Sequence, residues 1–148
     1  VISKKQVIKK YTSDDILAIL RMTVLGGTGR KADAKGYLVG GKTGTAEKLV
    51  GGRYSKTAVM SSFISVFPTN KPKYMVLAIV DNPSEKIPGV RPTGGQVSAP
   101  IVHNVIMRTG TLLGIKPQKD PGVNLNQDET SDQQEGTAPS EPPQDTEH

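Results

Sequence analysis

The sequence of 148 residues contains no cysteine and no tryptophan, and aromatic residues make up only 4% of it. The absence of cysteine excludes a disulfide framework and a thiolate metal site, although it is compatible with any compartment. Two Phe and four Tyr residues are too few stacking platforms for a typical single-stranded nucleic-acid binder. No apolar run reaches the roughly 18 residues that a membrane-spanning helix requires, and no signal peptide is visible. The chain begins at Val1 rather than Met, so if the protein is exported, we expect its targeting segment to lie upstream of this sequence.

Residues 116–148 are almost free of apolar side chains and rich in Pro, Gln, Ser and acidic residues. Such a segment cannot bury enough apolar surface to offset the entropy lost on ordering, which predicts a disordered acidic tail. The foldable part is then residues 1–115, enough for one modest core. Charge divides at the same boundary, because residues 1–115 carry a net charge of +11 and the tail carries −6. The basic body indicates an anionic partner or, more simply, a solvated basic surface.

Two segments have the local signals of helices. Thr12 and Asp15 have the spacing of a capping box, and apolar residues then recur at helical spacing until the pair Gly26-Gly27. Near the end of the foldable part, Ser98 and Pro100 predict the first turn of a second helix, because Ser is a good N-cap and Pro is tolerated there.

Between these helices lie three strand-like runs joined by short, turn-rich links. The first run ends at the glycine pair 51–52, which is typical of a tight hairpin, and the second ends at Pro68. The third, residues 74–80, is a run of seven consecutive apolar residues, which predicts burial on both faces. The expected fold class is α+β, a three-stranded antiparallel meander with flanking helices.

Two nucleotide-binding motifs match the sequence literally. Residues 36–43 fit G-x-x-x-x-G-K-[ST], but a P-loop needs a buried strand before it and a helix that begins at the Lys-Thr pair. The preceding segment is polar and Gly44 would fall in the first turn of that helix, so the P-loop nucleotide binder is a disfavoured alternative. Residues 27–32 fit G-x-G-x-x-[GA], but they follow a helix, whereas the dinucleotide fingerprint follows a strand.

Residues 42–45, Lys-Thr-Gly-Thr, carry the strongest functional signal, and we call them the KTGT segment. Strand alternation places Lys42 and Gly44 on one face and Thr43 and Thr45 on the other. A strand at the edge of a sheet can accept an extended peptide as an added strand, and Gly44 has no side chain to block that approach. An ammonium group with neighbouring hydroxyls can hold a terminal carboxylate, and a backbone N–H can contribute to an oxyanion hole.

Five sequence blocks in a fixed order resemble the end of the transpeptidase domain of class B penicillin-binding proteins, most of all the cell-division (septal) peptidoglycan D,D-transpeptidase. The blocks are GYLVGGKTGTAEK, GGRYS, SSFISVFP, YMVLAIVDNP and GGQVSAPI. The resemblance covers residues 1–115 and implies the C-terminal part of a penicillin-binding transpeptidase (β-lactamase-like) fold. The family uses the motifs S-x-x-K, S-x-N and K-[ST]-G. No serine of this chain has Lys three residues later or Asn two residues later, so only the third motif is present.

The resemblance also implies roles for the KTGT segment. Lys42 would lend positive charge and hydrogen-bond the serine of the second motif, and the Thr43 and Thr45 hydroxyls would bind the carboxylate of a stem peptide or a β-lactam. The Thr45 N–H would share the oxyanion hole with the missing nucleophilic serine, which makes Lys42 and Thr45 the catalytic residues of this piece. Gly44 completes the substrate-binding set. No metal or organic cofactor is implied.

The partners implied by the resemblance are peptidoglycan stem pentapeptides ending in D-Ala-D-Ala, β-lactams, the rest of the parent transpeptidase and division-complex proteins, but no nucleic acid. The implied location is the periplasmic face of the bacterial inner membrane, reached through an anchor outside this chain. Alone, the chain is expected to be inactive, because the nucleophile is absent. The alternative reading is a non-catalytic module that keeps a penicillin-binding pocket. His103 is interpreted as a structural residue, since no other site residue lies near it in the sequence.

Overall fold

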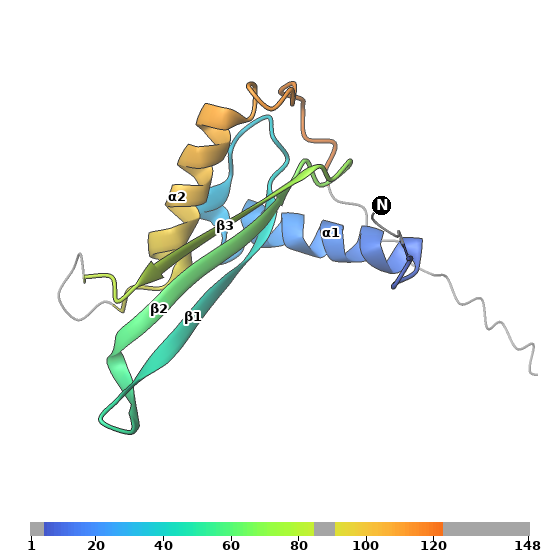
Figure 1. Ribbon diagram of the computed structural model, residues 1–148. Coiled ribbons are helices and arrows are strands. Elements are labelled where there is room, and N and C mark those ends of the chain that lie inside the picture. Colours follow the sequence, from blue (N-terminus) through green and yellow to red (C-terminus); the bar gives the residue numbers. More distant parts are fainter. Residues whose placement is uncertain (1–4, 85–90, 123–148) are drawn as a thin grey trace, which may run out of the picture.

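The computed structural model describes residues 5–84 and 91–122 of the chain. Within these ranges one helix precedes a three-stranded sheet and a second helix follows it (Figure 1). The elements are α1 (Lys10–Leu25), the short 3-10 helix η1 (Arg30–Ala32), β1 (Gly40–Val50), β2 (Arg53–Phe67), β3 (Tyr74–Asp81) and α2 (Gly94–Thr109). This order confirms the α+β class that the sequence predicts.

The strands form an antiparallel sheet in the order β1-β2-β3, which confirms the predicted meander. Gly51 and Gly52 have φ angles of 59° and 80°, and this left-handed conformation lets two residues join β1 to β2. β3 pairs with β2 only as far as Met60, so the β1–β2 hairpin extends beyond it, as Figure 1 shows. β1 is an edge strand of this sheet.

One face of the sheet, which we call the helix-covered face, packs against α2 and contains the core. The register places Thr43, Phe63 and Ala78 in one row on this face. Phe63 is fully buried, as are Val102 and Ile106 of α2. Burying such a side chain stabilises the fold by roughly 1.5–3 kcal/mol, so this face supplies a large part of the stability.

The opposite face, which we call the open face, leaves apolar side chains of β2 and β3 exposed. Met75, Leu77 and Ile79 are 68%, 53% and 56% exposed, and Ile64, which pairs with Leu77, is 41% exposed. Within the described residues, the prediction that residues 74–80 are buried on both faces is therefore wrong. The reason is that α2 covers one face only, whereas α1 approaches the open face near Gly40.

Both helices begin earlier than the sequence predicts. α1 begins at Lys10, and its N-cap residue Lys9 makes no side-chain capping bond, so the predicted cap at Thr12 is wrong. α2 begins at Gly94 and contains Pro100 in its interior. Ser98 is buried in the second turn, where its hydroxyl donates to the carbonyl oxygen of Ser61 at 3.0 Å. The Ser98 hydroxyl, which the local pattern predicts to cap the helix, therefore binds the sheet instead.

Residues 116–122, which we call the C-terminal strap, lie against the body of the fold. The Gln118 N–H donates to the Gly36 carbonyl oxygen at 2.9 Å, and the Gln118 side chain accepts from Asn70 at 3.0 Å. These contacts are polar rather than apolar, and the start of a disordered tail at residue 116 stays a prediction. Residues 123–148, the remainder of the predicted tail, lie outside the described residues.

Candidate functional site

The KTGT segment lies in the first half of β1, at the edge of the sheet. Lys42 pairs with Ile64 and Gly44 with Ser62, which places both on the open face. Thr43 and Thr45 lie on the helix-covered face, as the alternation in the sequence predicts. The segment thus presents one set of side chains to each face and a backbone edge between them.

The ammonium group of Lys42 is exposed and, among the described residues, forms hydrogen bonds only within its own strand. Its Nζ lies 3.0 Å from the Thr43 carbonyl oxygen and 3.5 Å from Thr43 Oγ1. Among the residues that the structure describes, no carboxylate forms an ion pair with Lys42, although five other such pairs are present. Its positive charge is therefore available to an anion that approaches the edge of β1.

The two threonine hydroxyls are held by segments that come from elsewhere in the chain. Thr43 Oγ1 lies 3.1 Å from Thr28 Oγ1, in the connection after α1. Thr45 Oγ1 accepts a hydrogen bond of 3.1 Å from the N–H of Gly94, the first residue of α2. Because Thr45 uses an oxygen lone pair in this bond, its own O–H proton remains able to donate to a ligand. The positive end of the α2 dipole lies beside it, which also favours an anion.

Glycines allow the close packing around the KTGT segment. A Cβ atom on Gly44 would lie 2.4 Å from Ser62 Oγ, so a larger residue there would require the serine side chain to rotate away. A Cβ on Gly94 would lie 2.2 Å from the Ser62 carbonyl oxygen and 2.6 Å from that of Gly44. The N-terminus of α2 therefore packs directly against the backbone of β1 and β2. This contact sets the distance between the helix and the KTGT segment.

In the structure, neither nucleotide-binding motif lies in the strand-to-helix context that it needs. Lys42 and Thr43 lie inside a strand rather than at the start of a helix, so residues 36–43 do not form a P-loop. Residues 27–32 follow α1 and include the three-residue η1, so a helix precedes them rather than the strand that the dinucleotide fingerprint requires. His103 Nδ1 donates to the Asp33 carbonyl oxygen at 2.9 Å, which agrees with its interpretation as a structural residue.

Several contacts of the site have no signal in the sequence. Nothing in the pattern joins Thr28 to Thr43, or the Gly94 N–H to Thr45, because each pair is far apart along the chain. The Gly94-Gly95 pair is visible in the sequence, but the local signals place the first turn of the helix at Ser98 and Pro100 instead. A glycine pair immediately before an amphipathic segment is the sequence signal that could have located the start of α2.

Within residues 5–84 and 91–122, no group of three His, Cys, Asp or Glu side chains is arranged to bind a metal ion. In the same ranges, neither helix has both the length and the apolar character that crossing a bilayer needs.

The comparisons with known proteins agree with this geometry. Residues 2–107 match the family described as "Penicillin binding protein transpeptidase domain". Stage V sporulation protein D of Bacillus subtilis is 44% identical over 119 residues, which cover 80% of this chain and 18% of that protein. The probable peptidoglycan D,D-transpeptidase FtsI of Caulobacter vibrioides is 40% identical over 122 residues, which cover 76% of this chain and 21% of that protein. The chain spans about a fifth of the length of these curated relatives.

Solved structures share the fold. The apo TP domain of Burkholderia pseudomallei penicillin-binding protein 3 has a TM-score of 0.69 at 31% identity, over 80% of this chain and 35% of that one. Penicillin-binding protein 3 of Mycobacterium tuberculosis, complexed with ampicillin, has a TM-score of 0.59 at 27% identity, over 78% of this chain and 26% of that one. Sequence, relatives and fold thus lead to one conclusion: the chain belongs to the family of penicillin-binding protein transpeptidase domains.

Proposed function

We propose that this chain forms the substrate-binding part of a peptidoglycan D,D-transpeptidase, a serine-type acyltransferase that cross-links the cell wall during division. The observation that carries the proposal is the KTGT segment on the exposed edge strand β1, with a Lys42 ammonium that has no carboxylate partner among the described residues. The proposal assigns substrate binding to all four residues of the segment, and catalytic roles to Lys42 and Thr45.

The proposed binding mode follows from the chemistry of an edge strand. An extended stem peptide adds to β1 through backbone hydrogen bonds, and the absence of a side chain at Gly44 keeps the approach open. The C-terminal carboxylate of the substrate, or that of a β-lactam, accepts hydrogen bonds from the Thr43 and Thr45 hydroxyls. Lys42 contributes positive charge from the open face, where a cationic donor strengthens a hydrogen bond to an anion.

In the proposed reaction, the serine of an S-x-x-K motif attacks the carbonyl carbon of the D-Ala–D-Ala bond. The terminal D-Ala leaves as an amine and an acyl-enzyme remains, which the amine of a neighbouring stem peptide then attacks to regenerate the serine. The Thr45 N–H is one donor to the developing oxyanion. The S-x-x-K serine, its lysine and the S-x-N motif belong to a part of the parent protein outside this chain, and no cofactor enters the reaction.

The proposed setting is the periplasmic face of the bacterial inner membrane, with the anchor in a part of the parent protein outside this chain. Division-complex proteins are the proposed macromolecular partners there. The FtsI relative, a probable peptidoglycan D,D-transpeptidase, and the ampicillin complex of the Mycobacterium tuberculosis neighbour support a place of action at the cell wall.

The test is covalent labelling by a fluorescent penicillin. The 148-residue chain should not be labelled, because it has no S-x-x-K serine. The domain completed with its preceding reading frame should be labelled, and Lys42→Ala should slow acylation by about 10²-fold, the scale expected when one preorganised electrostatic donor is removed from an active site. Thr45→Val should slow it as well, whereas Thr45→Ser should retain much of the rate. Lys71→Ala removes another exposed lysine, in the turn before β3, and serves as the matched control.

Two outcomes contradict the proposal. Stable labelling of the 148-residue chain would show that a nucleophile lies within it. A preceding reading frame without S-x-x-K and S-x-N would reject the enzyme and favour the non-catalytic binding module.

A further inference from the structure

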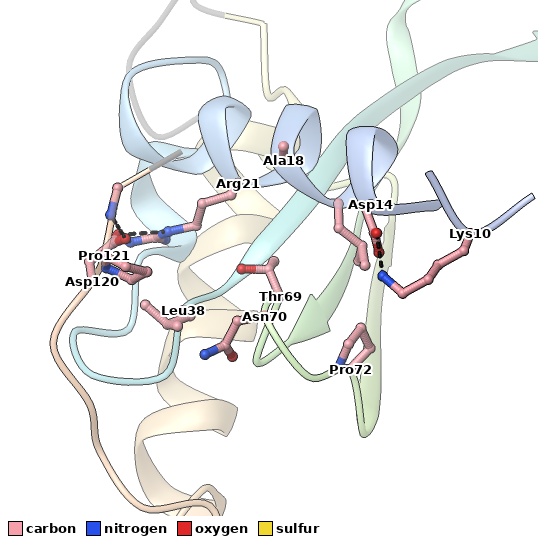
Figure 2. Close-up of a pocket in the computed structure, with 12 residues that line it drawn as sticks. Lys10, Asp14, Ala18, Arg21, Leu38, Thr69, Asn70, Pro72, Asp120 and Pro121 are labelled. Atoms are coloured by element: carbon pink, nitrogen blue, oxygen red, sulfur yellow. Dashed lines mark hydrogen bonds and ion pairs between the residues drawn. The ribbon is translucent and has the colours of Figure 1, made fainter. Parts of the chain in front are cut away.

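Arg21 of α1 is a buried cation held by two carboxylates. It is only 6% exposed, and its Nη1 lies 2.9 Å from Asp33 Oδ1. From the other side its Nε and Nη2 donate to Asp120 Oδ2 at 3.0 Å and 2.6 Å, as Figure 2 shows. A buried guanidinium requires such partners, because an uncompensated charge in the interior is strongly destabilising.

Asp120 belongs to the C-terminal strap and lies beyond residues 2–107, which match the family. The strap folds so that the second oxygen of Asp120 accepts the Gly122 N–H at 2.9 Å. Burial raises the pKa of Asp120, but hydrogen bonds from Arg21 and Gly122 and the charge of Arg21 outweigh this and hold the pKa below its usual value. Asp120 is therefore an anion matched to Arg21.

The same arginine touches the backbone that leads into the KTGT segment. Arg21 Nη1 donates to the Val39 carbonyl oxygen at 2.8 Å, and Val39 immediately precedes β1. Two more carbonyl groups of this connection are held from outside: Leu38 accepts from the Thr69 N–H at 2.9 Å and Gly36 from the Gln118 N–H at 2.9 Å. The entry to β1 is thus fixed by α1, by the turn after β2 and by the strap.

We propose that Asp120 is a positioning residue for the KTGT segment, acting through Arg21 on Val39. With Asp120 present, the guanidinium is held between two carboxylates in the orientation that allows Nη1 to donate to Val39. Without it, Nε and Nη2 lose their acceptor in a buried place, which is unfavourable. A pocket of about 340 Å³ borders Arg21 and gives the side chain room to turn toward water (Figure 2). Turning releases Val39, and the start of β1 becomes free to move.

The first test is hydrogen–deuterium exchange on the 148-residue chain, which does not depend on activity. Asp120→Asn should raise the exchange rate of amides in residues 36–45 by about tenfold, since one charge-assisted contact is lost, while β3 changes little. Asp120→Glu restores the carboxylate and should return most of the protection. The matched control is Asp14→Asn, which removes a carboxylate that lines the same pocket but pairs with Lys10. Unchanged exchange in residues 36–45, or an equal rise in β3, would overturn the proposal.

The second test rests on the proposed function. In the completed domain, Asp120→Asn should slow acylation by a fluorescent penicillin by about fivefold to tenfold, and Asp120→Glu should restore it, since misplacing a positioned group lowers the rate. Retention of the full rate by Asp120→Asn would contradict the positioning role. If the unmodified domain is not acylated although the exchange effect is present, the proposed function fails and the positioning role stands.

Discussion

The two faces of the sheet are stabilised in different ways. On the helix-covered face, α2 and the core side chains of β2 exclude water, and Phe63 and Phe67 are fully buried. On the open face, Met75 and Leu77 remain more than half exposed. Near the start of β1, Arg21 with its two carboxylates forms a polar cluster, which we call the polar anchor. The face that is packed supplies stability, while the face that is not packed displays Lys42.

The exposed apolar side chains of the open face indicate a surface for further contacts. Soluble proteins rarely expose large contiguous apolar patches, and such patches mark interfaces. The solved Burkholderia domain is longer than this chain, which covers 35% of it. We therefore expect the open face to be the surface on which the chain gains additional contacts.

The largest expected effect is the loss of stability when a side chain is truncated on the helix-covered face, compared with a truncation on the open face. Phe63→Ala should destabilise the chain by about 3–5 kcal/mol, because it leaves a cavity at a fully buried position. Leu77→Ala should cost less than about 1 kcal/mol, since the side chain is already 53% exposed. Denaturation in urea, followed by circular dichroism, measures both. Equal losses would contradict the division into two unlike faces.

A second prediction concerns the contact of α2 with the backbone of the sheet. Gly94→Ala should cost about 1–3 kcal/mol, because its Cβ would lie 2.2 Å from the Ser62 carbonyl oxygen. Gly26→Ala is the control, since a Cβ there meets nothing within 4 Å. The same denaturation assay compares them, and a neutral Gly94→Ala would show that α2 can shift away from the site without loss.

The open face should drive self-association of the chain. Exposed apolar side chains on strands next to an unpaired edge are an aggregation hazard. Leu77→Lys with Ile79→Lys should lower the association measured by analytical ultracentrifugation, with little change in secondary structure. As a control, Thr57→Lys adds a charge to an exposed position of β2 away from β3. A chain that is monomeric without any substitution would show that this face needs no cover.

The smallest expected effect is a pH dependence of the polar anchor. The pKa of Asp120 is lowered in the folded state, so its contribution to stability is present above its ordinary value of 3.8 and is lost as pH falls through the lower folded value. Arg21 faces this carboxylate, and Asp33 and the pair Lys10–Asp14 complete the charged surroundings. Melting temperatures of the unmodified chain and of Asp120→Asn should therefore converge below about pH 4. A difference in melting temperature that stays constant down to pH 2 would show that the ionised Asp120 is not the source of the stabilisation.

Much of the fold could be predicted because its signals are local. The glycine pair at 51–52 marks the hairpin, and period-two alternation assigns Lys42 and Thr43 to opposite faces. The order of five blocks along the chain predicts the family. The start of α2 could not be predicted, since Gly94 begins a helix only where a sheet lies directly beneath it.

The sequence by itself therefore determined the family, the antiparallel meander and the faces of the KTGT segment. The tertiary structure alone decided which face of β3 is covered, how α2 supports Thr45 and where the strap is held. These features depend on contacts between residues that are distant in the sequence; Arg21 and Asp120, for example, are 99 positions apart. A local pattern contains the propensity of each segment, but the partner that satisfies a buried charge or covers an apolar face is set only when the chain has folded.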